Sequence, residues 1–145
     1  MKVLLDANVL ISILLAKSGE SPIVTIAHAL SIGLFTPVVS EATVREMAHA
    51  VQQKPYLARR IEPEKMDDFI NMLKLANGIV PSTNAAPELV LRDARDDYLI
   101  LTARQHRVDM LVSGDEDVLA HAGNEPFAIL SPPAFVAALK ELAEE

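Results

Sequence analysis

The stretch "KVLLDANVLISILLA", residues 2–16, decides the fold class of this chain. Its first four residues form a short, mostly apolar run that ends at Asp6, which is typical of a buried β-strand. The residues after Asp6 continue as a largely apolar helix. A strand that leads directly into a helix is characteristic of α/β proteins. The opening residues therefore predict an α/β fold with Asp6 at the end of its first strand.

The same alternation of strands and helices continues almost to the end of the chain. Apolar runs, caps and prolines predict further strands near residues 34–39, 79–81, 109–113 and 127–130, with helices between them. Parallel strands joined by right-handed crossovers place helices on both faces of a sheet. We therefore expect a single domain, residues 1–145, with a three-layer α/β/α architecture and a mainly parallel sheet of about four or five strands.

The composition indicates a cytoplasmic protein with one hydrophobic core. The chain has 145 residues, 50% of them hydrophobic, and no cysteine. Its longest apolar run, residues 9–16, is far shorter than the roughly 20 residues of a membrane-spanning helix, so no membrane association is expected. The net charge of -7 argues, taken alone, against nucleic acid as a partner. Acids that are gathered to hold cations would, however, leave the working surface less negative than the total suggests.

Two acids follow predicted strands. Asp6 follows the first strand, and Asp115 follows the strand at residues 109–113. Because the carboxyl ends of parallel strands meet at one edge of a sheet, these two side chains are expected to lie near each other. Either aspartate alone is explained equally well as the cap of the next helix. Two acids at one edge favour a functional role over two unrelated helix caps.

The helix that begins near residue 95 offers two adjacent acids. Asp96 heads an apolar stripe of this helix and is therefore expected to point inward. The stripe consists of Leu99, Ile100 and Ala103. Asp97 is rotated by about 100° towards a mixed, more exposed face. A first-turn acid that interacts only with the helix dipole explains Asp96 equally well.

Glu46 is less obvious as a candidate from its pattern. It shares a stripe with Ala42 and Ala50 that borders the apolar face of its helix. Helical phase alone predicts a solvated side chain there. The small alanines one turn before and after would nevertheless let a long carboxylate reach inward.

Four stretches, in this order and spacing, resemble the PIN-domain ribonucleases: "VLLDANVLIS", "SEATVREM", "DARDDYLILTA" and "MLVSGDEDVL". The similarity is closest to VapC-like toxin components of prokaryotic toxin–antitoxin pairs and covers essentially the whole chain. The resemblance implies a PIN-like fold with four catalytic acids, Asp6, Glu46, Asp96 and Asp115. It also implies supporting positions at Asn8, Ser113 and Asp117, the last as a further metal ligand. Relatives often have one acid fewer than "RDD", so the choice between Asp96 and Asp97 stays open.

Four carboxylates at one edge require neutralisation. At separations of roughly 5 to 6 Å, each ionised pair repels by about 3 kcal/mol at an effective dielectric near 20. Protons or hard divalent cations relieve this repulsion. Carboxylate oxygens without cysteine or clustered histidines favour Mg²⁺ or Mn²⁺ over Zn²⁺. The expected metal ligands are Asp6, Asp96, Asp115 and Asp117.

A site of this kind suits phosphodiester hydrolysis, because a metal ion lowers the pKa of a bound water that can then act as the nucleophile. The resemblance makes the substrate RNA, single-stranded or looped, and implies an antitoxin partner and a homodimer. Contacts to the RNA backbone are expected from a basic segment that contains Lys54, Arg59 and Arg60, with Lys65 nearby and Tyr56 available for stacking. A solvated basic stretch explains the same residues equally well.

Two other classes of function stay open. A phospho-acceptor signalling domain also gathers acids and Mg²⁺ at strand ends, but it needs paired acids near the first strand and a lysine late in the chain. Here the first strand ends in "LLDAN", with a single acid, and Lys140 lies in the final helix. A catalytically silent PIN-like binding module is the other class, and the presence of all four acids argues against it.

Overall fold

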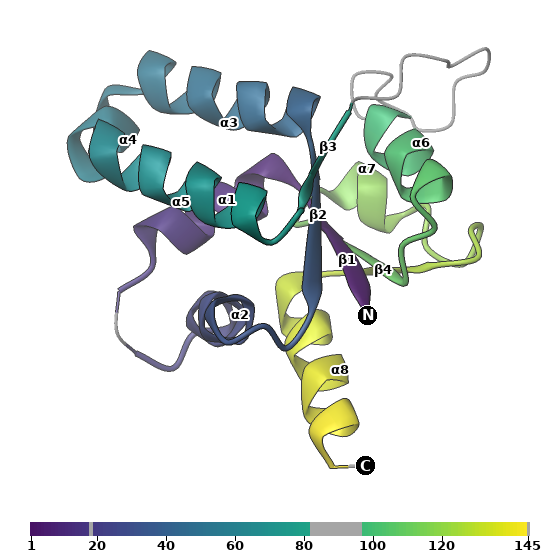
Figure 1. The fold of residues 1–145 in the computed structure, drawn as a ribbon. Helices are drawn as coiled ribbons and strands as arrows, with labels where there is room; N and C mark the ends of the chain where they lie inside the picture. Colours follow the sequence, from purple (N-terminus) through teal and green to yellow (C-terminus); the bar gives the residue numbers. More distant parts are fainter. Residues whose placement is uncertain (18, 82–96, 145) are drawn as a thin grey trace.

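Five parallel strands form the centre of the computed structural model, which describes residues 1–17, 19–81 and 97–144 (Figure 1). Their order in the sheet is β3-β2-β1-β4-β5. The strands are β1 (Lys2–Leu5), β2 (Thr36–Ser40), β3 (Ile79–Val80), β4 (Met110–Val112) and β5 (Ala128–Leu130). The predicted α/β fold with a mainly parallel sheet is therefore confirmed.

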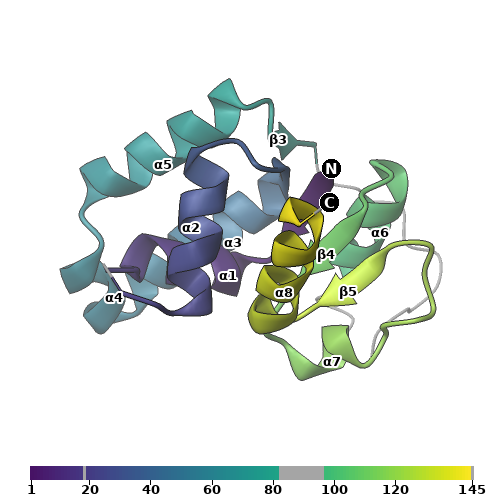
Figure 2. The same cartoon turned by 90° about the horizontal axis from the view of Figure 1, so that it is seen from below.

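Helices cover both faces of this sheet. They are α1 (Ala7–Leu15), α2 (Pro22–Ser31), α3 (Glu41–Gln53), α4 (Pro55–Arg60), α5 (Pro63–Leu75), α6 (Asp97–Gln105), α7 (Glu116–Leu119) and α8 (Pro132–Ala143). Figure 2, seen from below, shows α6 and α7 on the opposite side of the sheet from α1, α2, α3 and α5. In the described part of the chain, no helix is long and apolar enough to cross a membrane.

The sheet separates two hydrophobic clusters. Successive side chains of a strand point to opposite faces, so Val3 and Leu5 pack into one cluster and Leu4 packs into the other. The larger cluster lies against α1, α2, α3, α5 and α8, and the smaller one lies under α6 and α7. Burial on both faces explains why the strands are apolar without alternation.

One helix differs from the sequence-based expectation. The helix that follows β2 ends just before Pro55, as the proline predicts, but the basic segment after it was not predicted to be helical. The structure shows that α3 ends at Gln53 and that Pro55 begins the separate helix α4. Proline fits the first turn of a helix because its missing N–H is not needed there. The loop expected at residues 82–94 lies outside the described residues.

Candidate active site

The pairing of β1 with β4 brings two polar residues together at the carboxyl edge of the sheet. Leu5 lies opposite Val112, and the next residue of each strand, Asp6 and Ser113, is buried. The Ser113 hydroxyl donates a hydrogen bond to one Asp6 carboxylate oxygen, at 2.7 Å. The other oxygen accepts from the backbone N–H of Ala7, at 2.6 Å. Asp6 is therefore fixed by its own helix and by the neighbouring strand.

Ser113 also links Asp6 to Asp115. Its hydroxyl oxygen accepts a hydrogen bond from the backbone N–H of Asp115, at 3.0 Å. The Asp115 carboxylate accepts from the backbone N–H of Asp117, at 2.8 Å, and so caps α7. Both Asp115 and Asp117 are half-buried. Asp6 and Asp115 thus do cap helices, and they also share one hydrogen-bonded network at the sheet edge.

Glu46 is held at the same edge by a residue from another helix. The hydroxyl of Tyr98, in the first turn of α6, donates a hydrogen bond to the Glu46 carboxylate. Tyr98 in turn accepts a hydrogen bond from the Thr43 hydroxyl, at 3.4 Å. Ser40 donates to that same Thr43 hydroxyl, at 3.1 Å. A chain of hydroxyl groups therefore runs from the end of β2 to the exposed Glu46 side chain.

Tyr98 is a site residue that the sequence reasoning missed. Burial raises the pKa of the Tyr98 hydroxyl above its usual value, and the hydrogen bond to Glu46 raises it further. The hydroxyl therefore stays protonated and keeps its donor role at neutral pH. Its sequence position could have identified it, because Tyr98 directly follows the predicted acids and its hydroxyl needs a hydrogen-bond partner when the ring is buried.

The acids of the two networks repel one another. Burial is the largest cause that raises the pKa of Asp6, and the negative charges of Glu46 and Asp115 raise it further. Hydrogen bonds from Ser113 and Ala7 act in the opposite direction. Three of the four predicted acids therefore lie close enough to interact electrostatically. Among the residues that the structure describes, however, no three acidic or histidine side chains converge tightly enough to form a ready-made metal site.

The α6 acids require one correction. Asp97 is buried, with 3% of its surface exposed, so the expectation of a more exposed side chain was wrong. Asp97 shares a face of α6 with Ile100, Leu101 and Arg104. The physical reason is that Ile100, about one turn later on this face, is fully buried, and the face becomes exposed only towards its end, where Leu101 is half-buried and Arg104 is exposed. The predicted apolar stripe of Leu99, Ile100 and Ala103 is buried as expected. Asp96 lies outside the described residues, so its position stays a prediction.

The other predicted residues lie at the surface. Asn8 is exposed in the first turn of α1. Lys54 precedes α4, and Arg59 and Arg60 form the last turn of that helix, all three exposed. Figure 1 shows α4 well away from the start of α6. Contacts of these cations with RNA therefore stay a prediction.

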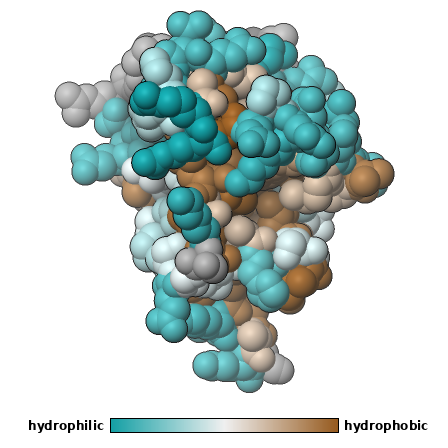
Figure 3. Space-filling view, turned by 90° about the vertical axis from the view of Figure 1, so that its left-hand side faces the viewer, coloured by the Kyte–Doolittle hydropathy of each residue, from teal (hydrophilic) through white to brown (hydrophobic). Residues whose placement is uncertain are grey.

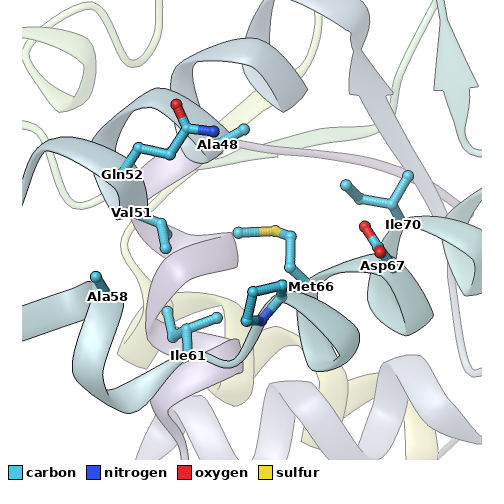
Figure 4. Close-up of a pocket in the computed structure, with 9 residues that line it drawn as sticks. Ala48, Val51, Gln52, Ala58, Ile61, Met66, Asp67 and Ile70 are labelled. Carbon is cyan, nitrogen blue, oxygen red and sulfur yellow. The ribbon is translucent and has the colours of Figure 1, made fainter.

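A separate apolar hollow of about 310 Å³ lies between α3, α4 and α5 (Figure 4). Val51, Ile61 and Met66 are among the side chains that line it. Of the predicted catalytic acids, the three that the structure describes, Asp6, Glu46 and Asp115, do not belong to its lining. The hollow is therefore distinct from the acidic edge.

The fold and the acidic edge together define the class of protein. Residues 2–117 match the family model of the PIN domain. The chain therefore belongs to the PIN domain family, whose members are typically nucleases that bind divalent metal ions.

Among solved structures, the chain is similar to a chain of "Structure of FitAB bound to IR36 DNA fragment". The two are 22% identical with a TM-score of 0.58, and the match covers 90% of this chain and 94% of the other. This likeness bears on the fold alone. No curated protein matches the chain.

Proposed function

We propose that this protein is a metal-dependent endoribonuclease that hydrolyses single-stranded or looped RNA, and that it is the toxin of a toxin–antitoxin pair. The observation that carries the proposal is that Asp6, Glu46 and Asp115 lie at one edge of a PIN fold, where burial and then the charges of Glu46 and Asp115 raise the pKa of Asp6. Membership of a nuclease family supports the reaction. The resemblance of its sequence motifs to VapC-like toxins supports the toxin role.

The donor set fits Mg²⁺ or Mn²⁺. The acids offer hard oxygen ligands. A bound divalent cation would offset the cost of burying the negative charge of Asp6 and would reduce its repulsion by the neighbouring acids, the two effects that raise the pKa of Asp6. The ion would be held by Asp6, Asp115, Asp117 and an acid at the start of α6, Asp96 or Asp97. When bound, a divalent cation activates the attacking water and stabilises the leaving oxygen.

The protein's own residues prepare the site for this chemistry. Two hydrogen bonds use two of the roughly four acceptor positions of the Asp6 carboxylate, so others remain for a cation. Ser113 keeps Asp6 and Asp115 in a fixed relation because it bonds to both. Tyr98 holds the Glu46 carboxylate, which is exposed and can orient the attacking water and accept its proton.

An antitoxin partner, a homodimer and a cytoplasmic location belong to the same proposal. They rest on the resemblance to VapC-like toxins. Exposed apolar side chains, among them Ile32 at 56% and Leu34 at 59%, offer surface for contact with another protein.

The direct test is an RNA cleavage assay with purified protein free of antitoxin. We expect cleavage of single-stranded RNA that requires Mg²⁺ or Mn²⁺, is lost in EDTA and does not depend on any histidine. Glu116→Gln is a matched control, because Glu116 lies beside Asp115 but is exposed; it should cleave at the wild-type rate within a few fold. Acetyl phosphate serves as the second substrate. Stable phosphorylation of an aspartate without RNA cleavage would replace the nuclease by the signalling alternative.

A further inference from the structure

A second hollow, of about 200 Å³, lies at the far end of α1 from Asp6. It is lined by Leu14, Leu15, Ala16, Lys17, Arg60 and Lys65. Its three cations come from three different segments: the residues after α1, the last turn of α4 and the first turn of α5. Figure 3 shows this side of the molecule, where hydrophilic side chains border a strip of apolar surface.

The charges around this hollow are not neutralised. The whole chain has 13 basic and 20 acidic residues, yet three cations gather here. Within the described ranges, none of them forms an ion pair, although Glu62 and Glu64 are close to Lys65 in the sequence. All three side chains are exposed, so water and salt screen their mutual repulsion, and their free donors are available to a bound anion.

Helix-end electrostatics explains only part of the cluster. Lys17 and Arg60 lie at the carboxyl ends of α1 and α4, where a cation interacts favourably with the helix dipole. Lys65 lies in the first turn of α5, where the dipole disfavours a cation. The position of Lys65 therefore needs another explanation, and an anionic ligand supplies one.

We infer that this hollow, which we call the basic hollow, binds a backbone phosphate of the RNA strand whose scissile bond lies at the acidic edge. The inference rests on the proposed function. Helix α1 connects the two sites, since Asp6 precedes it and Lys17 follows it. The eleven residue steps from Asp6 to Lys17 correspond to about 16 Å at the helical rise of 1.5 Å per residue. That length is about five nucleotides at the roughly 3.4 Å rise of a stacked strand.

An RNA phosphate fits these observations better than an acidic peptide does. The hollow is compact and brings three cations to one point, which suits a single concentrated anion. A nucleic acid strand also repeats its phosphates at regular intervals, so one molecule can occupy both ends of α1. Of the cations expected from the sequence to contact RNA, Arg60 and Lys65 line this hollow and Lys54 and Arg59 do not, whereas Lys17 is an additional cation.

The test compares two triple variants that each replace two lysines and one arginine by glutamine. The first is Lys17→Gln, Arg60→Gln, Lys65→Gln; the control is Lys74→Gln, Arg107→Gln, Lys140→Gln, at exposed positions elsewhere. Both are measured on RNA of about 12 nucleotides and on a trinucleotide. We expect the first triple to raise KM for the longer RNA about tenfold, with kcat and the trinucleotide unchanged. The slope of log affinity against log salt concentration should become shallower by about 0.7, the value for one lost phosphate contact on a single strand.

The remaining outcomes distinguish a failure of the basic hollow from a failure of the proposed nuclease function. Equal effects of both triples, or a wild-type KM in the first triple, would overturn the basic hollow while leaving the nuclease intact. Absence of RNA cleavage and binding in the wild type would overturn the proposed function. If a glutamate-rich peptide binds the wild type but not the first triple, and RNA binding is unchanged, the hollow serves a protein partner and the inference is wrong. Lys65→Gln alone, expected to raise KM two- to threefold, gives the same decision if the triple variant does not fold.

Discussion

The two halves of the acidic edge are held in different ways. Asp6 and Asp115 lie at strand ends, and backbone N–H groups and the buried Ser113 fix their carboxylates. Glu46 lies on a helix and is exposed, and the hydroxyl of Tyr98, 52 residues away in the sequence, holds it. The sheet therefore positions the first half, whereas the second half depends on one contact between two helices. In the first half, a substitution of the acid should remove its charge without moving its neighbours. In the second half, loss of the single contact should displace Glu46 and slow the reaction at the same time.

Asp6→Asn is expected to have the largest effect on activity. Asparagine keeps an oxygen that can accept from Ala7 and gains an amide that can donate to Ser113, whose hydroxyl proton can rotate away. The geometry should therefore survive while one negative charge is lost. We expect RNA cleavage to fall by orders of magnitude, calorimetric titration to show weaker Mg²⁺ binding, and the metal-free protein to melt at a higher temperature. Equal metal uptake by the wild type and this variant would show that Asp6 is not a ligand.

The adjacent acids Asp96 and Asp97 give the next largest effect. Asp96→Asn is expected to reduce cleavage by orders of magnitude if Asp96 is the ligand implied by the family resemblance. The burial of Asp97 changes the expectation for its own variant. We expect Asp97→Asn to lower cleavage at least tenfold, because Asp97 is buried at the start of α6 directly before Tyr98, which holds Glu46. Cleavage rates and melting temperatures of both variants, with and without Mg²⁺, are the measurements. A nearly wild-type Asp97→Asn beside an inactive Asp96→Asn would mean that Asp97 serves only the start of the helix.

The difference between the halves also explains how much the sequence could predict. The end of a strand is marked by the end of an apolar run, and parallel strands share one edge, so Asp6 and Asp115 could be placed together from "KVLLDAN" and "MLVSGDED" alone. Helical phase correctly placed the stripe of Leu99, Ile100 and Ala103 in the interior.

The remaining features depend on how the helices pack around the sheet. Phase gives the direction of Asp97 around its own helix but does not say how closely other elements cover that face. The contact between Tyr98 and Glu46 depends on where the sheet order places α3 and α6. The basic hollow depends on how the end of α1 packs against the junction of α4 and α5, which is far from α1 in the sequence. These features follow from tertiary arrangement, which local patterns do not encode.

Tyr98→Phe tests the weaker half of the edge and should have a smaller effect. The ring keeps its packing, but Glu46 loses its hydrogen-bond donor. One hydrogen bond to a charged group contributes about 1.5 to 3 kcal/mol, so we expect kcat to fall roughly ten- to a hundredfold. KM for RNA should stay unchanged if Tyr98 positions Glu46 and does not bind substrate. Tyr56→Phe is the matched control, because Tyr56 is exposed on α4, and it should leave kcat unchanged. A parallel rise in KM and loss of stability would assign Tyr98 a structural role only.

The smallest expected effect is on the pH dependence of stability in the metal-free protein. Folding raises the pKa of Asp6 above its ordinary value of 3.8, chiefly through burial, so the folded state binds this proton more tightly than the unfolded chain does. The charge on Asp6 therefore destabilises the fold above the folded-state pKa, and this cost disappears as the pH falls towards 3.8. Asp6→Asn removes the cost, so its stability advantage over the wild type should be present at neutral pH and vanish in acid. The measurement is urea unfolding of both proteins in EDTA, from neutral pH down to about pH 3.8. The difference between their free energies of unfolding isolates Asp6, because groups that the two proteins share titrate alike in both. Added Mg²⁺ at neutral pH should favour the wild type, because the ion binds its folded state more tightly. A stability difference that stays constant with pH would show that the buried Asp6 charge is already compensated by its two hydrogen bonds.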